Sequence, residues 1–292
     1  MPDQVTLRVW RGDAESGEFR DYRVEAEEGE VVLDVLHRLQ ATQAGDLAVR
    51  WNCKAGRCGS CSTEINGVPK LACMTRMNTF PEGDPITVAP MKTFPLIRDL
   101  VTDVSFNYKV AERVPAFRPR AKDPKTEADG HYRMKQEDIE RVQEFRRCIE
   151  CFLCQDVCHV IRDHEENKPN FGGPRFFIRY AELEMHPLDT NDRRKLLREQ
   201  EGLGYCNITA CCQATCPEDI GITNNGIIPL KERVVDSKYD PVRWLGRTLF
   251  RKRGDPNAEA GVEETGGGDH AGTVGSAAGG DARRVDPEGH RA

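Results

Sequence analysis

The sequence predicts an α+β protein in which a sheet-rich N-terminal domain precedes an all-α C-terminal domain. Apolar and polar residues alternate with a period of two in the first part of the chain, whereas apolar residues recur at helical spacing beyond residue 134. Twelve cysteines fall into three groups, one in the first part and two in the second. With 292 residues, the chain is long enough to build two separate cores.

Residues 1–105 have the pattern of a β-grasp domain, in which a helix lies across a small sheet. The expected elements, in chain order, are strands at 5–9 and 22–26, a helix at 31–42, a hairpin that turns at Asn66-Gly67 and a closing strand at 86–88. The first two strands show the alternation of half-buried strands, and Asn-Gly is a strongly favoured pair in two-residue hairpin loops.

The rest of the chain divides into three parts by composition. Residues 106–133 carry several prolines and many charges with little periodicity, which predicts a linker that wraps the surface. Residues 134–250 predict a helical domain. Its amphipathic segments lie at 176–185, 192–197 and 222–235. Residues 251–292 are rich in Gly, Ala, Asp and Glu with almost no large apolar residue, which predicts a disordered tail.

The first cysteine group has the spacing of a [2Fe–2S] ligand set. Cys53, Cys58 and Cys61 follow the plant-type ferredoxin pattern, and Cys73 supplies a fourth thiolate from the strand after the hairpin. Two glycines in the loop between these cysteines let the backbone approach an inorganic core closely. We therefore expect these four cysteines to hold one [2Fe–2S] cluster.

The second and third groups are interpreted together. Their first run has the bacterial ferredoxin spacing, in which the fourth cysteine ligates the other cluster of a pair. The expected [4Fe–4S] ligands are Cys148, Cys151, Cys154 and Cys216. In the third group Thr209 stands where a cysteine belongs, and an alcohol is a poor iron ligand beside thiolates. The expected [3Fe–4S] ligands are Cys158, Cys206 and Cys212.

Cys211 is left over from these three sets, and two hypotheses remain open for it. It is either a small residue packed beside the third cluster, as is common for a free cysteine, or a fourth ligand that makes the cluster [4Fe–4S].

The charge, the apolar content and the cysteine spacing argue against several classes of function. The formal net charge of −6 argues against nucleic acid as a main partner, because phosphate binding needs a basic surface. No stretch approaches the ~18 apolar residues of a membrane span, and the N-terminus lacks the apolar segment of a secretory signal. In a reducing compartment, cysteines at these spacings indicate metal rather than disulfides. Zinc is disfavoured because a single tetrahedral ion would leave cysteines of one run unused.

Together these motifs resemble the iron–sulfur subunit of succinate dehydrogenase and fumarate reductase, the complex II family. The resemblance covers residues 1 to about 245 and includes the hairpin before Cys73 and the Cys216-Pro217 pair. It implies that electrons pass singly between the covalent FAD of a flavoprotein subunit and a quinone, through [2Fe–2S], [4Fe–4S] and [3Fe–4S] clusters. It further implies membrane-anchor subunits, a peripheral position on the cytoplasmic face of the plasma membrane, and no catalytic residue on this chain. The direction of catalysis is left open.

The chain departs from the family pattern beside two cluster cysteines. His159 follows Cys158, where the family has proline, and Asn207 follows Cys206, where it often has histidine. His159, Asn207 and Thr209 are therefore the candidate residues near the quinone, which would be menaquinone or another quinone type. Two hypotheses remain for His159: a proton donor at the quinone, because imidazole titrates near neutral pH, or a histidine satisfied by backbone at a subunit interface.

Other functions are compatible with the motifs. One is the iron–sulfur subunit of another flavoenzyme complex or of a disulfide reductase, and another is a large soluble ferredoxin-type carrier. The length of the chain and the altered third group argue against a bare carrier.

Overall fold

The computed structural model describes residues 3–239. The predicted tail at 251–292 and the last part of the predicted helical domain lie outside the described residues. The strands are β1 (Asp3–Gly12), β2 (Gly17–Ala26), β3 (Ser62–Ile65), β4 (Val68–Leu71), β5 (Ile86–Ala89), β6 (Leu96–Arg98) and β7 (Val101–Thr102). The α-helices are α1 (Val32–Thr42), α2 (Ser105–Arg113), α3 (Gln136–Gln143), α4 (Leu153–Asp156), α5 (His159–Arg162), α6 (Pro174–Glu184), α7 (Arg194–Glu199), α8 (Cys211–Ala214) and α9 (Ile228–Tyr239).

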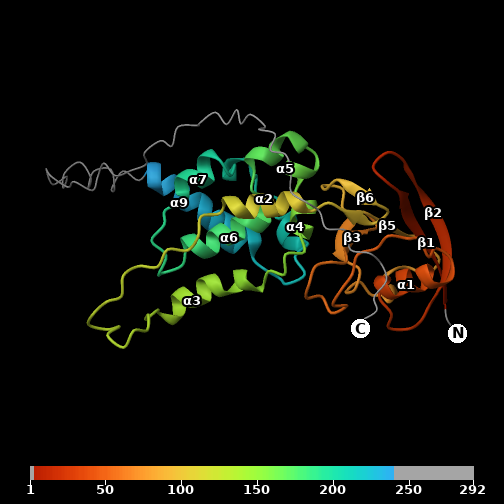
Figure 1. Ribbon diagram of the computed structural model, residues 1–292, viewed down its shortest axis with the longest axis horizontal. Helices are drawn as coiled ribbons and strands as arrows, with labels where there is room; N and C mark the ends of the chain where they lie inside the picture. The colour runs from red at the N-terminus through yellow and green to blue at the C-terminus, as the bar shows by residue number, and fades with distance from the viewer. Residues whose placement is uncertain (1–2, 240–292) are drawn as a thin grey trace, which may run out of the picture. The chain divides into compact units, whose positions relative to one another are not determined.

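The N-terminal domain is a mixed five-stranded sheet with α1 packed across one face (Figure 1). The strand order is β2-β1-β5-β3-β4, with β1 antiparallel to β2 and parallel to β5. Leu7 and Val9 of β1 and Val88 of β5 are completely buried, in one core with Leu36 and Leu39 of α1. Alternation along the strands sends these side chains to the helix-covered face. The predicted sheet-rich domain with a crossing helix is confirmed.

The hairpin between β3 and β4 positions two of the candidate ligands. Asn66 and Gly67 have φ values of 51° and 75°, the positive pair that a type I′ turn requires. Its register pairs Ser62 with Leu71. Cys61 and Cys73, which flank the hairpin, are thereby brought together, and the backbone N–H of Cys73 donates to Sγ of Cys61 over 3.5 Å.

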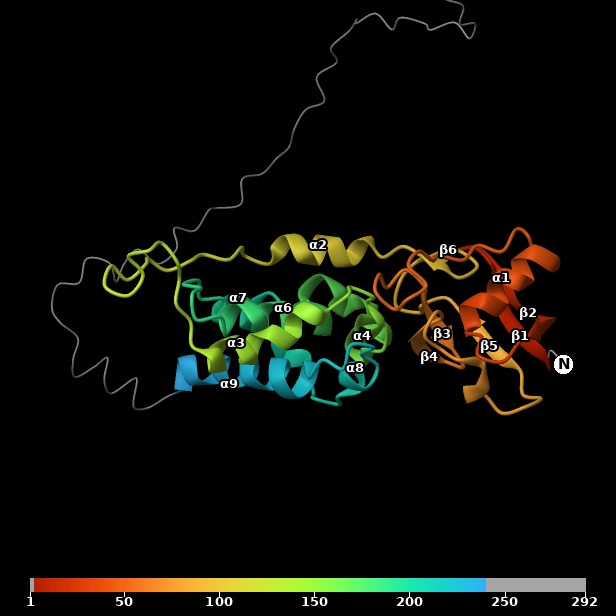
Figure 2. The same cartoon turned by 90° about the horizontal axis from the view of Figure 1, so that it is seen from below.

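The stretch expected to be a linker contains a helix, α2. Only Asn107 and Val110 of this helix are buried, so its amphipathic signal is weak, and two prolines follow it closely. Figure 2 shows α2 running alongside the helices of the C-terminal domain. Beyond it the chain pairs with the loop after α6: the N–H of Arg120 donates to the carbonyl of Leu188 over 2.8 Å.

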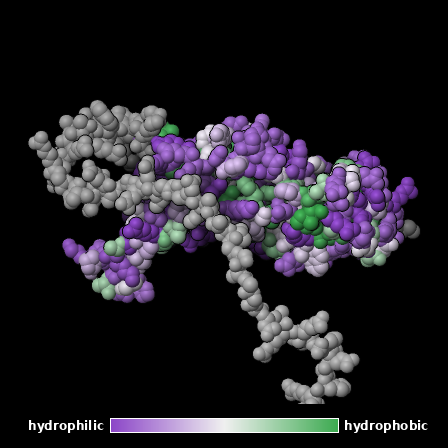
Figure 3. Space-filling model, turned by 45° about the horizontal axis from the view of Figure 1, so that its top comes forward, coloured by the Kyte–Doolittle hydropathy of each residue, from purple (hydrophilic) through white to green (hydrophobic). Residues whose placement is uncertain are grey.

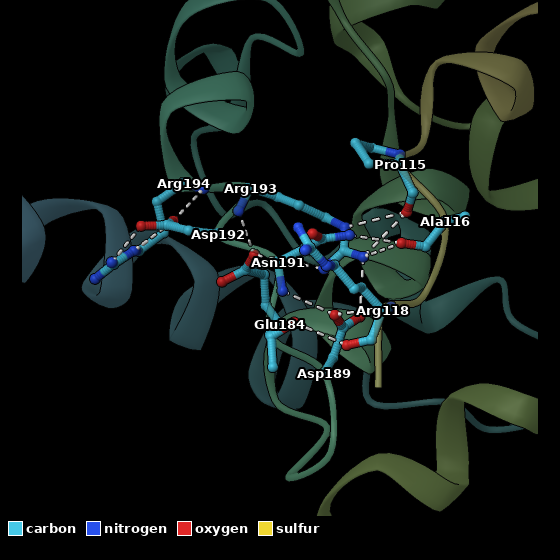
Figure 4. A network of polar contacts seen from close by, with 10 residues as sticks. Pro115, Ala116, Arg118, Glu184, Asp189, Asn191, Asp192, Arg193 and Arg194 are labelled. Atoms are coloured by element: carbon cyan, nitrogen blue, oxygen red, sulfur yellow. Dashed lines mark hydrogen bonds and ion pairs between the residues drawn. The ribbon is translucent and has the colours of Figure 1, made fainter. Parts of the chain in front are cut away.

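The segment between α2 and α3, residues 114–135, is called the strap below. A buried arginine attaches it to the helical domain (Figure 4). Arg193 is 1% exposed and donates to the carbonyl oxygens of Pro115 and Ala116 at 3.1 and 2.9 Å. The same guanidinium contacts Asp189 at 2.9 Å, and Asp189 is equally buried. One side chain therefore holds the polypeptide backbone of the strap and balances a carboxylate that would otherwise be buried alone.

The C-terminal domain is helical, as predicted, and α6 lies in its core. Phe176, Phe177, Ile178, Tyr180 and Ala181 of this helix are buried together with side chains of the neighbouring helices. The predicted segments at 176–185 and 192–197 correspond to α6 and α7. The third, at 222–235, forms a π-helical turn at Ile222–Ile227 that continues into α9.

The face shown in Figure 3 is mainly hydrophilic and includes a hydrophobic area. Large apolar side chains that are exposed include Trp51 and Met74 near the first cysteine group and Tyr205 and Ile208 near the third. Within residues 3–239 none of the helices is long and apolar enough to cross a membrane.

Candidate metal centres

In the first cysteine group, Cys53, Cys58 and Cys61 lie in the loop between α1 and the β3–β4 hairpin, and Cys73 follows the hairpin. Cys53 is exposed, Cys58 is half-buried, and Cys61 and Cys73 are buried. Backbone N–H groups already point at these sulfurs: those of Ala55 and Arg57 lie 3.4 and 3.3 Å from Sγ of Cys53, and that of Cys53 lies 3.5 Å from Sγ of Cys58. N–H groups aimed at sulfur stabilise thiolate, which is the ligand form of cysteine.

The surroundings shift the pKa values of Cys58 and Cys61 in opposite directions. Burial alone would raise the pKa of Cys58, but hydrogen bonds from Ser60 and from the N–H of Cys53 outweigh it and lower the pKa to about 7. Burial raises the pKa of Cys61 to about 12. Cys58 therefore loses its proton readily, whereas Cys61 needs a bound cation to become a thiolate.

The second centre is a cavity walled by cysteines from both helical runs. Cys148, Cys151, Cys154 and Cys216 line it. Cys216 lies more than 60 positions after the other three in the sequence, and the contact between α4 and α8 brings them together. The structure thus gathers the four residues that the sequence assigned to a [4Fe–4S] cluster.

The third centre is a separate cavity. Cys158, Cys206 and Cys212 line it, together with Thr209 and Cys211. Cys158 comes from the first run and the others from the second, so the two runs exchange their last cysteines. This exchange is the one that the ferredoxin spacing predicts.

The two runs also have the same backbone conformation. Phe152 and Ala210 have nearly identical left-handed dihedrals, φ/ψ 60°/11° and 60°/10°, and each begins a four-residue helix, α4 or α8. Two residues earlier, Glu150 and Ile208 also have positive φ. Thr209 therefore takes the position of Cys151.

The same equivalence gives Cys211 the position of Leu153 in the first run. Leu153 is 1% exposed and packs in the core of the N-terminal domain. Cys211 is instead half-buried at the wall of the third cavity, with its Sγ 3.4 Å from Oγ1 of Thr209. Both hypotheses for Cys211 remain compatible with this placement.

The donor set of the two helical cavities fits a positively charged cluster core. Burial is the largest cause that raises the pKa of Cys151 and Cys158 to about 12 and that of Cys212 to about 11. Several buried thiolates side by side are stable only with a cation between them. Within residues 3–239, no group of three or more His, Cys, Asp or Glu could hold a metal ion as the side chains stand.

The three candidate quinone residues are not all together. His159 and Thr209 line the third cavity, whereas Asn207 is exposed and is not part of its wall. His159 is half-buried and begins α5 directly after Cys158.

The loops of the first and second centres touch, a contact that sequence patterns do not reveal. The hydroxyl of Ser62 lies 2.9 Å from the carbonyl oxygen of Cys151 and 2.8 Å from that of Gly59, and can donate to either. Gly59 has φ +67°, and a Cβ there would lie 2.5 Å from Cα of Cys151. A glycine is required for this close approach.

Comparison with known proteins identifies both domains. Residues 6–109 match the family model of a 2Fe-2S iron-sulfur cluster binding domain, and residues 144–220 match that of a 4Fe-4S dicluster domain. The fumarate reductase iron-sulfur subunit of Mycobacterium tuberculosis is 34% identical over 75% of this chain and 89% of that protein. That of Wolinella succinogenes is 30% identical over 80% and 99%. A chain in the structure of the Mycobacterium smegmatis Sdh1 complex in the apo form is 64% identical, with a TM-score of 0.78, over 83% of this chain and all of that one.

Proposed function

The chain belongs to the iron–sulfur subunit family of succinate dehydrogenases and fumarate reductases, and we propose that it passes electrons between the FAD of a flavoprotein subunit and a membrane quinone. As a member of this family it is an electron-transfer subunit of an oxidoreductase. The dicarboxylate substrate is handled by the flavoprotein, so this chain needs no acid, base or nucleophile for the chemistry of that substrate.

The observation that carries the proposal is the exchange of cysteines between two cavities. Two runs with one backbone conformation enclose two separate sulfur-lined spaces, and each space takes its last cysteine from the other run. Such an arrangement keeps two redox centres side by side in one rigid frame. When bound, iron–sulfur clusters take up and release single electrons at potentials set by their surroundings.

The proposed ligands follow the three centres. Cys53, Cys58, Cys61 and Cys73 would hold [2Fe–2S], Cys148, Cys151, Cys154 and Cys216 would hold [4Fe–4S], and Cys158, Cys206 and Cys212 would hold [3Fe–4S]. Thr209 at the position of Cys151 supports three irons in the last centre. Loop N–H groups would donate hydrogen bonds to the sulfurs of Cys53 and Cys58, and apolar side chains of the helical core surround the other two centres.

At the far end of the relay, we propose that the third centre faces the quinone and the membrane-anchor subunits, at the cytoplasmic face of the membrane. The exposed side chains of Tyr205 and Ile208 beside this centre are suited to an apolar partner. His159 at the cavity wall is the proposed proton donor, and Asn207 would act only through contacts outside this cavity. Menaquinone is one candidate acceptor.

The proposal is tested on the complex purified anaerobically by a tag on this chain. We expect a flavoprotein to co-purify, about nine irons per polypeptide, and EPR signals of all three cluster types. Succinate should reduce the clusters, and an added quinone should reoxidise them. A flavoprotein that acts on another substrate would instead support a different flavoenzyme, and the absence of any stable partner would support a free carrier.

A matched pair of variants tests the ligand assignment. Cys154→Ser should remove the [4Fe–4S] signal and electron transfer to quinone, because Cys154 is buried between the other ligands. Cys211 is the first residue of α8. Cys211→Ser should keep both the [4Fe–4S] signal and electron transfer to quinone. Retention of the [4Fe–4S] signal in Cys154→Ser would contradict the assignment.

A further inference from the structure

Arg175 is a buried cation in the wall of the second centre. It is the second residue of α6, its side chain is only 11% exposed, and it lines the cavity together with Cys148, Cys151 and Cys154. Burial alone would lower the pKa of Arg175, but the neighbouring Cys148 sulfur and Glu150 carboxylate outweigh burial and raise it.

The guanidinium is only partly satisfied within the chain. Nη2 donates to Oε1 of Glu150 at 2.5 Å, and Cζ lies 5.6 Å from the ring centre of Phe176. Nε is buried and has no hydrogen-bond partner among the described residues. A buried donor without a partner costs about 1–3 kcal/mol, and more when it is charged, so this N–H requires an acceptor that the polypeptide does not supply.

We propose that Arg175 donates Nε–H to a sulfur of the second cluster and raises the reduction potential of that cluster above those of sites without such a cation. The inference rests on the proposed function, because it needs a cluster between Cys148, Cys151, Cys154 and Cys216. Reduction adds one negative charge to the cluster, and a fixed positive charge beside it stabilises the reduced state more than the oxidised state. The apolar surroundings weaken this interaction little, because few solvent dipoles oppose it.

The effect should be specific to the second centre. The described residues that line the third cavity include no arginine or lysine. Arginine is suited to the role because its guanidinium stays charged when buried and is less strongly hydrated than an ammonium group. Glu150 is 54% exposed, so its opposing charge is partly screened by water while Arg175 faces the cavity.

The test is a redox titration of the tagged complex followed by EPR of the reduced [4Fe–4S] cluster. In Arg175→Gln we expect the oxidised-to-reduced ratio at a fixed ambient potential to rise about tenfold, which is about 59 mV for a one-electron couple. The other two clusters should titrate as in the wild type. Arg179→Gln is the matched control: it lies one turn later on α6, is 44% exposed and pairs with Glu182.

A second variant removes a negative charge in place of a positive one, and it keeps the buried side chain of Arg175. Glu150→Gln removes the carboxylate that opposes Arg175, so the potential of the second cluster should rise. If Arg175→Gln does not assemble, Glu150→Gln is the deciding variant. An unchanged or lower potential of its second cluster would then overturn the inference. A wild-type complex without a [4Fe–4S] signal would refute the proposed function itself. A normal signal that Arg175→Gln leaves at the wild-type potential would refute only the role of Arg175.

Discussion

Thr209 and Cys151 occupy equivalent positions in two runs of the same conformation, and this equivalence decides the expected composition of the third cluster. The flanking left-handed residues match to within a few degrees, so the side chains at 209 and 151 leave the backbone in the same direction. The hydroxyl of Thr209 contacts Cys211, its neighbour at the cavity wall. In the proposed assignment, this one oxygen in place of one sulfur is the reason to expect three irons at the third centre.

Replacing Thr209 with cysteine should complete the ligand set. In Thr209→Cys we expect the EPR signal of an oxidised [3Fe–4S] cluster to disappear and the iron content to rise from about nine to about ten per chain. Cys211→Ala should leave the signal as it is in the wild type. If the wild type lacks the signal and Cys211→Ala produces it, Cys211 is the fourth ligand.

Ser62 makes one of the contacts between the loops of the first and second centres. Its hydroxyl is the donor within reach of the Cys151 carbonyl, and the loss of one such hydrogen bond costs about 1 kcal/mol. In Ser62→Ala we expect the loops to separate slightly and electron transfer between the first two clusters to slow several-fold, measured by rapid-freeze EPR after succinate addition.

A threonine at the same domain boundary provides the control for Ser62. Thr93 donates its hydroxyl to the carbonyl of Asp156 over 3.0 Å, and Arg162 also donates to this carbonyl over 3.0 Å. Thr93→Val therefore removes an interdomain hydrogen bond without leaving the acceptor unpaired. Equal rates in Ser62→Ala and the wild type would show that the contact has no part in electron transfer.

At the scale of elements, the buried side chain of Arg193 adds to the backbone hydrogen bonds that attach the strap between α2 and α3 to the helical domain. Without Arg193, the carboxylate of Asp189 would remain buried at 1% exposure without the guanidinium that pairs with it, and Glu184, at 5% exposure, would lose one of its cationic neighbours. Breaking a buried ion pair by removing one partner costs about 3–5 kcal/mol. We expect Arg193→Ala to lower the thermal unfolding midpoint strongly and to expose the strap to proteolysis.

The next residue along the chain offers the control for this prediction. Arg194 pairs with Asp192, which is 57% exposed, and exposed pairs contribute about 0–1 kcal/mol. Arg194→Ala should therefore unfold close to the wild type. Similar midpoints for the two variants would contradict the view that Arg193 fastens the strap.

The elements differ in how far the sequence could predict them. The ligand spacings, the Asn66-Gly67 turn and the amphipathic helices are local patterns, and they led to the correct elements. Helix α2 was missed because its buried face consists of two residues. Arg175 and Ser62 were missed for another reason: their partners lie 25 and 89 positions away, and only the packing of α6 and of the two domains brings them together.

At the scale of the whole molecule, six of the twelve cysteines are buried in the cores of the two domains. Cys154, Cys158 and Cys212 are buried within the apolar core of the helical domain, around helices α4, α5 and α8 of four residues each. Helices this short have no stability of their own in water. The sheet domain differs, because its core consists mainly of aliphatic side chains from β1, β5 and α1.

Removal of iron should therefore affect the two domains unequally. Metal binding is coupled to folding where the ligands lie in the core, so anaerobic chelation should leave the sheet protected from hydrogen exchange while residues 144–230 lose protection. Hydrogen-exchange mass spectrometry of the same preparation before and after chelation measures this. The first loop provides an internal comparison, since it should exchange faster while β1 and β5 on the same domain do not. Equal protection of both domains after complete loss of iron would mean that the helical core is stable without its clusters, and the short helices would then need another source of stability.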